Sequence, residues 1–266
     1  MMPRLIDCRT ILLLSLLVAG CASSPTSRRQ VVLYSDDVMA SQGISTYEQM
    51  QAELPVETDS RRLAYVRCVT GYIVDALSSQ ERGDNAWEVT LFKDDQANAF
   101  ALPGGKMGVF TGLLDVATNQ HQLAAVMSHE VGHVLARHSN ERASQAALRD
   151  IGLAAAQQAG VSDQTLQLIG FGANLGFFLP FNRVQESEAD QIGIMLMARA
   201  GFDPQESINL WHNMAANGGS RPPEFLSTHP SPDTRIADLN RQLSRAEAQW
   251  LAARNQGRVP DCVAPD

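Results

Sequence analysis

The spacing of apolar residues predicts a mainly helical chain with a short extended region before its middle. Over residues 60–79 the apolar positions recur at intervals of three and four, which is typical of an amphipathic helix. The same pattern predicts further helices over residues 121–137, 143–159, 184–200, 204–216 and 233–253. Apolar and polar residues alternate over 87–91, and the short apolar runs 99–102 and 107–110 flank a Pro-Gly-Gly turn. The chain is therefore expected to be α+β and mainly α-helical, with a small antiparallel sheet early in the fold.

The N-terminal residues have the pattern of a leader that is removed from the mature protein. Arg4 and Arg9 precede the apolar run 11–20, which is too short for a membrane-spanning helix but typical of a secretory signal peptide. The sequence L-V-A-G-C at 17–21 resembles the lipobox of bacterial lipoproteins, which implies cleavage before Cys21 and its lipidation. We therefore expect a signal peptide over 1–20 and a lipid anchor at Cys21 that holds the protein to a membrane, facing the bacterial periplasm and attached to the outer membrane.

Composition divides the mature chain into an N-terminal segment, one domain and a tail. The Ser-, Pro- and Thr-rich residues 22–29 resemble a flexible tether, within a segment that we expect to span 21–55. The domain is expected over 56–255 and the tail over 256–266. A hydrophobic content of 44% and a charged content of 19% suit a single well-packed core. The net charge of −8 argues against nucleic acid as a partner.

The strongest chemical signal is the sequence H-E-V-G-H at residues 129–133, within the predicted helix 121–137. Residues four apart share one face of a helix, so the imidazoles of His129 and His133 can bind one Zn²⁺ ion. Glu130 projects beside that face, where it can take a proton from an attacking water molecule without binding the metal. The apolar neighbours of the motif argue against two unrelated surface histidines. The pattern indicates a catalytic site with one zinc ion per chain.

A catalytic zinc ion needs a third protein ligand, and two candidates follow the motif. His138 lies nine residues after His129, but no glycine turn separates it from His133. We therefore expect His138 to point away from the metal and to interact with carbonyl groups at the helix end. The better candidate is the acidic sequence E-S-E-A-D at 186–190.

The combination of H-E-V-G-H and E-S-E-A-D resembles the zinc metallopeptidase family of HtpX, the CAAX prenyl protease, BepA and LoiP. The segments N-A-F-A-L-P-G-G at 98–105 and S-T-H-P at 227–230 also resemble that family, and the resemblance covers roughly residues 55–245. It implies a zincin-like peptidase fold with Glu186 as the third metal ligand. It also implies that Asp190 holds a ligating histidine by its outer ring nitrogen. Glu188 is the rival ligand, but its position two residues after Glu186 places it on another side of the helix.

The resemblance leaves the role of His229 open. This residue could donate a hydrogen bond to the oxyanion of the reaction, act as a fourth ligand that closes the resting site, or cap a backbone group. Because His229 precedes Pro230, its backbone is stiff and not helical. We place it among the catalytic residues, with Glu130 and Asp190. Arg235 is expected to anchor this loop by pairing with a carboxylate.

Two features outside the motifs carry further predictions. Residues 151–182 contain Asp163 as their single charged residue, which suits a buried helical hairpin, a cover over the cleft, or an apolar surface for unfolded substrate or a partner. Once Cys8 has left with the leader and Cys21 carries lipid, the cysteines that remain are Cys68 and Cys262. We predict a disulfide between them, whereas the alternative is a buried thiol at Cys68 and an unrelated thiol in the tail.

Together these features predict a zinc-dependent endopeptidase of the bacterial cell envelope that cleaves misfolded or misassembled periplasmic and outer-membrane proteins. An extended substrate would add a strand beside Ala99, Phe100, Ala101 and Leu102 and lie across the zinc ion. The alternative is a chaperone-like assembly factor for outer-membrane proteins, acting with an assembly machinery, whose proteolysis is latent.

Overall fold

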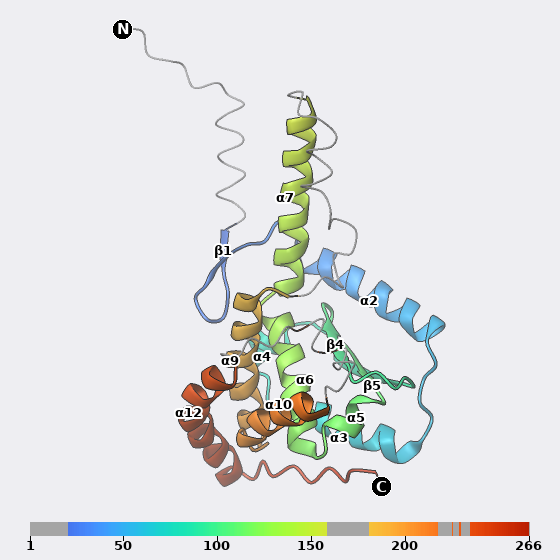
Figure 1. The fold of residues 1–266 in the computed structure, drawn as a ribbon, viewed down its shortest axis with the longest axis vertical. Coiled ribbons are helices and arrows are strands. Elements are labelled where there is room, and N and C mark those ends of the chain that lie inside the picture. Colours follow the sequence, from blue (N-terminus) through green and yellow to red (C-terminus); the bar gives the residue numbers. More distant parts are fainter. Residues whose placement is uncertain (1–20, 159–180, 218–224, 226–228, 230–234, 266) are drawn as a thin grey trace.

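The computed structural model describes residues 21–158, 181–217, 225, 229 and 235–265 (Figure 1). Its strands are β1 (Cys21–Ser23), β2 (Arg29–Val31), β3 (Glu88–Phe92), β4 (Ala99–Leu102) and β5 (Lys106–Phe110). Its helices are α2 (Asp36–Glu53), α3 (Ser60–Asp75), α4 (Ser79–Arg82), α5 (Leu113–Val116), α6 (Gln120–Leu135), α7 (His138–Gln158), α9 (Arg183–Arg199), α10 (Gln205–Asn217) and α12 (Arg235–Asn255). The prediction of a mainly helical α+β fold is confirmed.

The predicted helices are present with small shifts at their ends, and α2 is an addition. Ser35 caps α2 by accepting a hydrogen bond from the Val38 N–H group. The helix buries Met39, Gly43 and Tyr47, one residue per turn, so its apolar face is narrow. The Tyr47 hydroxyl lies 2.7 Å from the Thr90 hydroxyl on β3, which joins α2 to the sheet. A stripe this narrow explains why the apolar spacing did not predict the helix.

The three-stranded sheet is mixed rather than fully antiparallel. Its strand order is β3-β5-β4, with β5 parallel to β3 and antiparallel to β4. Gly104 and Gly105 form the turn between β4 and β5 with positive φ angles of 88° and 77°. Strand β5 lies in the centre, between β3 and β4. It runs parallel to β3, and the hairpin turn makes β4 antiparallel to it. Within the described residues β4 is an edge strand.

Helices α6 and α9 form the centre of the fold, and they approach each other at glycines. A Cβ atom on Gly193 of α9 would lie 2.9 Å from the backbone nitrogen of His129. A Cβ atom on Gly132 of α6 would lie 2.9 Å from the carbonyl oxygen of Ala189. Such contacts are too short for any side chain, so the backbones pack directly against each other. This packing brings the H-E-V-G-H helix and the E-S-E-A-D helix side by side (Figure 1).

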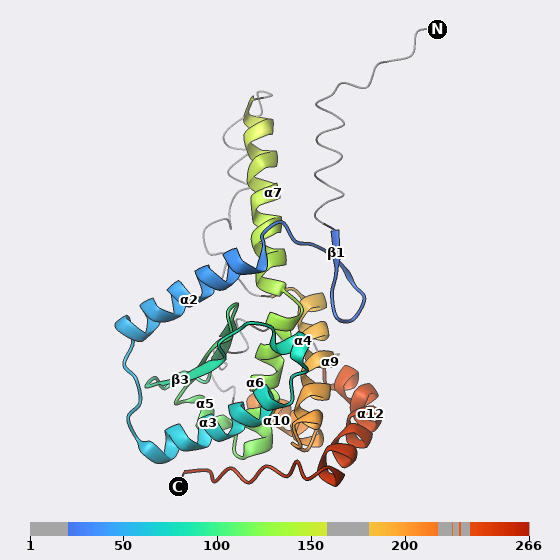
Figure 2. The ribbon, with the colours of Figure 1, turned by 180° about the vertical axis from the view of Figure 1, so that it is seen from behind.

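The N-terminal segment packs on the domain, whereas the sequence suggested a flexible tether. Strands β1 and β2 pair antiparallel, and we call residues 21–31 the N-terminal hairpin. The hairpin lies beside the base of α7 (Figure 2). Further along the chain, the Leu33 N–H group donates a 2.8 Å hydrogen bond to the hydroxyl of Ser144 on α7. The predicted signal peptide over 1–20 lies outside the described residues, and lipidation of Cys21 stays a prediction.

Helix α7 extends away from the rest of the fold (Figures 1 and 2). Ile151, near its end, is exposed, with 64% of its surface accessible. Residues 159–180 of the predicted segment lie outside the described residues, so the alternatives for 151–182 stay predictions. In the part of the chain that the structure describes, no helix is long and apolar enough to cross a bilayer.

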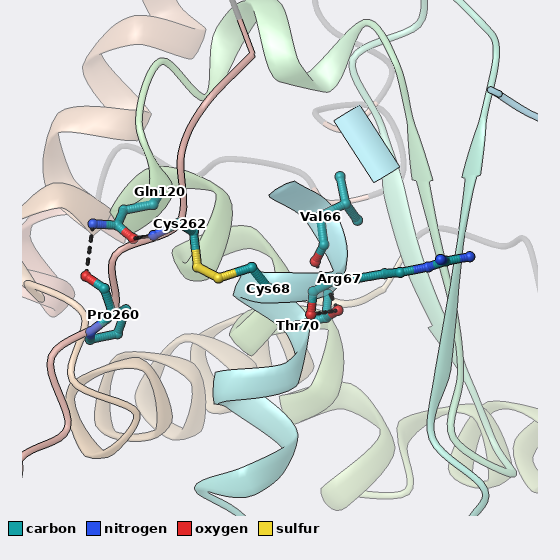
Figure 3. The surroundings of a disulfide bond; sticks show 7 residues. All are labelled: Val66, Arg67, Cys68, Thr70, Gln120, Pro260 and Cys262. Carbon is teal, nitrogen blue, oxygen red and sulfur yellow. Dashed lines mark hydrogen bonds between the residues drawn. A yellow bond between two sulfur atoms is a disulfide. The ribbon is translucent and has the colours of Figure 1, made fainter. Parts of the chain in front are cut away.

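The C-terminal tail is joined to the domain by a disulfide between Cys68 of α3 and Cys262 (Figure 3). Gln120, at the start of α6, holds the tail through its side chain. Its Oε1 accepts from the Cys262 N–H group at 2.9 Å, and its Nε2 donates to the Pro260 carbonyl at 3.1 Å. The tail is therefore fixed against α3 and α6.

Candidate metal centre

His129 and His133 lie one turn apart on α6, which begins at an Asn119 cap that accepts hydrogen bonds from the N–H groups of His121 and Gln122. Both imidazoles are buried, and their Nε2 atoms are 3.0 Å apart. The two nitrogens therefore point toward one place on the buried face of α6, as the spacing of the motif predicts.

Glu186 reaches the same place from the first turn of α9. Asn182 and Gln185 form a capping box that fixes this end of the helix. The carboxylate oxygens of Glu186 lie 3.4 Å from His129 Nε2 and 3.4 Å from His133 Nε2. The Nδ1 atom of His229 is 3.0 Å from Glu186 and 3.3 Å from His129. One potential ligand atom from each of these four residues lies within 4.8 Å of all the others.

This donor set fits a bound transition metal. Two imidazoles and a carboxylate, all buried, are the ligands of a catalytic site in which a further position binds water or substrate. Glu130 is also buried, and its Oε1 accepts no hydrogen bond from the described residues, although His229 Nε2 lies 3.4 Å away. A buried carboxylate oxygen without a hydrogen bond is costly to maintain, and a proton acceptor at a reaction site accounts for it.

Burial and the surrounding charges set the proton affinities of the site. Burial raises the pKa of Glu130 above its usual value, which makes the carboxylate a stronger proton acceptor. Burial lowers the pKa of His133 well below its usual value, which favours the neutral imidazole that a metal requires. Burial would raise the pKa of Glu186, but hydrogen bonds with His129, His133 and His229 outweigh it and hold this pKa below its usual range.

Asp190 lies one turn after Glu186 and supports His129 from behind. Its Oδ1 is 2.9 Å from His129 Nδ1, which leaves Nε2 of the ring directed at Glu186. Arg235, at the start of α12, pairs with both Asp190 and Glu186 and stacks 4.1 Å above the ring of Trp211. Burial and the charge of Arg235 lower the pKa of His129, but the hydrogen bonds to Asp190 and Glu186 outweigh them and raise it to about 9.

His138 lies behind His133 and outside the cluster of potential metal ligands. Arg137 adopts a positive φ of 56°, which ends α6 and turns the chain before α7. His138 Nδ1 is thereby brought to 2.8 Å from His133 Nδ1, on the side of His133 that faces away from Glu186. His138 is thus outside the cluster of potential ligands, as predicted, but it contacts a ligand histidine instead of carbonyl groups, because Arg137 takes the left-handed conformation and turns the chain.

An aromatic contact at His133 could not be expected from the motifs. The ring of Phe181 stacks on His133 at 3.7 Å between centroids, and the guanidinium of Arg142 lies 3.8 Å from the centre of the Phe181 ring. Phe181 belongs to the apolar segment 151–182, and its composition alone gave no reason to place it at the metal centre. Glu188, the rival ligand, faces away from Glu186, as predicted, and contacts the N-terminal hairpin.

A buried His-Glu-x-x-His helix joined to a glutamate from a neighbouring helix is the arrangement of a zincin-like metallopeptidase. Comparison with known families agrees, because residues 60–243 match the model of Peptidase family M48. The chain belongs to this family. The resemblance that the sequence motifs indicated is confirmed.

Among individual proteins, the chain is 41% identical to the mitochondrial metalloendopeptidase OMA1 of Schizosaccharomyces pombe over 62% of this chain and 49% of that protein. It is 38% identical to OMA1 of Saccharomyces cerevisiae over 65% of this chain and 54% of that protein. It is 31% identical to the beta-barrel assembly-enhancing protease of Escherichia coli over 79% of this chain and 47% of that protein. The chain thus spans about half the length of these relatives.

These relatives correct the predicted location. The lipobox-like sequence at 17–21 indicated a lipid-anchored protein of the bacterial periplasm. The relatives with 41% and 38% identity are mitochondrial enzymes, which contradicts that prediction. A short apolar leader followed by a cysteine is a weak signal, because signals for different membranes share a basic start and an apolar core.

Proposed function

We propose that the protein is a zinc-dependent endopeptidase that hydrolyses peptide bonds in unfolded or misassembled proteins, with Glu130 as the general base. One observation carries this proposal: a buried carboxylate, one of whose oxygens has no hydrogen bond from the described residues, lies beside a converging cluster of two histidines and a glutamate. Imidazole and carboxylate ligands in a buried site suit zinc, which is the metal we propose.

The residues in and around the cluster have separate roles in hydrolysis. His129, His133 and Glu186 would hold the ion, which when bound polarises a carbonyl group and makes water a better nucleophile. Glu130 takes the proton of the attacking water at Oε1 and then gives it to the leaving amine. Asp190 and Arg235 fix the orientation of His129 and Glu186 throughout.

The substrate is proposed to bind as an added strand along β4. Strand β4 pairs with β5 on one side, has no strand partner on the other within the described residues, and packs against α6, which carries the metal ligands. A strand addition beside Ala99, Phe100, Ala101 and Leu102 requires an extended chain, which folded proteins rarely offer. This mode supports unfolded or misassembled substrates. The name of the Escherichia coli relative, beta-barrel assembly-enhancing protease, supports substrates connected with beta-barrel assembly.

Removal of the metal tests the proposal. We expect the purified protein to cleave an unfolded protein such as casein, to lose this activity on dialysis against a chelator, and to regain it with one equivalent of zinc. Turnover of casein would be measured together with the metal content of the same samples. Cleavage that persists in metal-free protein would contradict the proposed mechanism.

His229 is proposed to act as a fourth ligand that closes the resting site, because its Nδ1 lies among the ligand atoms, 3.0 Å from Glu186. The expected result for His229→Ala is faster casein cleavage than wild type with zinc retained, since substrate then meets no competing imidazole. A fall in turnover of about 10²–10³-fold would instead assign the oxyanion role. An unchanged rate would contradict both roles and leave His229 as a loop residue.

A further inference from the structure

One arginine of the N-terminal hairpin, Arg28, contacts both α9, which carries Glu186, and α7, which follows the H-E-V-G-H helix. The Nε of Arg28 donates to Glu188 of α9 at 2.6 Å. Its two terminal nitrogens donate to the two oxygens of Glu141 of α7, each at 2.7 Å. The side chains of Glu141 and Glu188 are 5% and 3% exposed, so Arg28 pairs with two carboxylates that water scarcely reaches.

Glu188 connects this arginine to the metal ligand His133. Its Oε1 accepts hydrogen bonds from the hydroxyls of Ser24 and Thr26, both in the N-terminal hairpin. Its Oε2 lies 3.2 Å from Nε2 of His138, which is fully buried. Nδ1 of His138 is 2.8 Å from Nδ1 of His133. A continuous chain of contacts thus leads from the hairpin to the cluster.

The chemistry of ligation fixes the direction of every hydrogen bond in this chain. His133 directs Nε2 toward Glu186, so this nitrogen must keep its lone pair for a metal and Nδ1 must carry the hydrogen. Nδ1 of His138 therefore accepts, and its Nε2 carries the hydrogen that is donated to Glu188. Glu188 must in turn be an acceptor only, and the donors around it, which come from the hairpin, hold it as a carboxylate.

The other metal-binding histidine has the same kind of support without an intermediate. His129 donates directly to Asp190, and Asp190 pairs with Arg235. In both cases a carboxylate of α9 that is paired with an arginine sets the tautomer of a ligand histidine. For His129 the carboxylate is Asp190 and the contact is direct. For His133 the carboxylate is Glu188, the contact passes through His138, and the arginine belongs to the N-terminal hairpin.

We propose that Arg28, Glu188 and His138 are positioning residues for His133, and that the N-terminal hairpin thereby completes the metal centre. The inference rests on the metal site of the proposed function. It assigns a role in metal binding to a segment that lies outside the residues matched by the family, 60–243. Displacement of residues 21–31 from α7 and α9 would loosen the hold of the site on its metal.

The test measures zinc affinity by competition with a chelator in the full chain. Removal of a group that orients a ligand weakens metal binding by about 10–100-fold, so His138→Ala should fall in this range while still binding one zinc ion at saturation. Arg28→Ala should weaken zinc binding about tenfold. The variant keeps His138 but removes the arginine that holds Glu188, the hydrogen-bond acceptor of His138. Arg29→Ala is the matched control, because Arg29 is the exposed neighbour on β2 and should retain wild-type affinity.

A double variant separates positioning from a general structural role. If Arg28 acts through His138, Arg28→Ala should change zinc affinity little in the His138→Ala background. Equal losses in both backgrounds, or an Arg28→Ala protein with wild-type affinity, would overturn the inference. Since Arg28 is partly exposed, its variant should fold, and thermal unfolding of the metal-free proteins checks this. Wild-type protein that binds no zinc would overturn both this inference and the proposed function, whereas wild-type affinity in Arg28→Ala overturns this inference alone.

Discussion

The Glu130→Gln protein should bind zinc as the wild-type protein does and lose about 10²–10⁴-fold in turnover of an unfolded substrate. The amide keeps the size and shape of the side chain but has no basic oxygen to accept the proton of water. Glu130 lies beside the ligand cluster and is not part of it, so the metal site is expected to remain intact. Casein hydrolysis and metal content of the same preparation give the two quantities.

The control for this change is Glu247→Gln, which removes an exposed carboxylate on α12 and should leave both quantities unchanged. An active Glu130→Gln protein would move the general base to another residue. The inactive variant has a further use, because a substrate bound along β4 would not be cleaved. Substrates captured on Glu130→Gln and absent from the wild-type protein would identify the natural targets.

Glu186→Ala should remove stoichiometric zinc and with it all measurable hydrolysis. Glu186 is the one carboxylate in the cluster, and the two histidines alone leave a metal with too few protein ligands. Metal analysis after gel filtration measures the loss. Ser187→Ala, at the adjacent exposed position of α9, should retain one zinc ion per chain.

The Glu186→Ala substitution also removes one of the carboxylates that pair with Arg235, whose guanidinium lies 2.9 Å from Glu186. A destabilised protein could lose metal for that reason, so Glu186→Gln, which keeps the volume and a polar oxygen, accompanies it. Folded Glu186→Gln protein with weakened zinc binding supports a direct role as ligand. Stoichiometric zinc with wild-type affinity in both variants would transfer the third-ligand role to His229.

Local periodicity and a family motif were sufficient to predict the elements and residues at the heart of the site. His129 and His133 follow from helix geometry alone, because positions four apart share a face. The buried strip of α6 and the helical run that begins near Arg183 were also visible in the apolar spacing. The pairing of Glu186 with these histidines depends on the contact between α6 and α9, which no local pattern contains.

The features that sequence did not predict depend on tertiary contacts or on rare backbone conformations. The place of His138 follows from the positive φ of Arg137, and only glycine would have signalled such a turn. The N-terminal hairpin has the composition of a linker and is ordered by Glu141 and Glu188, which lie far away in the sequence. The strand order β3-β5-β4 also depends on a tertiary choice. Strand β4 pairs with the side of β5 that β3 leaves open, and the alternation of apolar and polar residues does not encode this.

The disulfide between Cys68 and Cys262 makes a covalent ring of nearly the whole catalytic domain, since the two cysteines are 194 residues apart. His129, His133, Glu186 and His229 all lie inside this ring. A single cut anywhere between the second histidine and the glutamate, by this enzyme or another protease, would leave the two sets of ligands on one covalently connected molecule. A nicked enzyme would therefore migrate as one species on a non-reducing gel and separate into two fragments only after reduction.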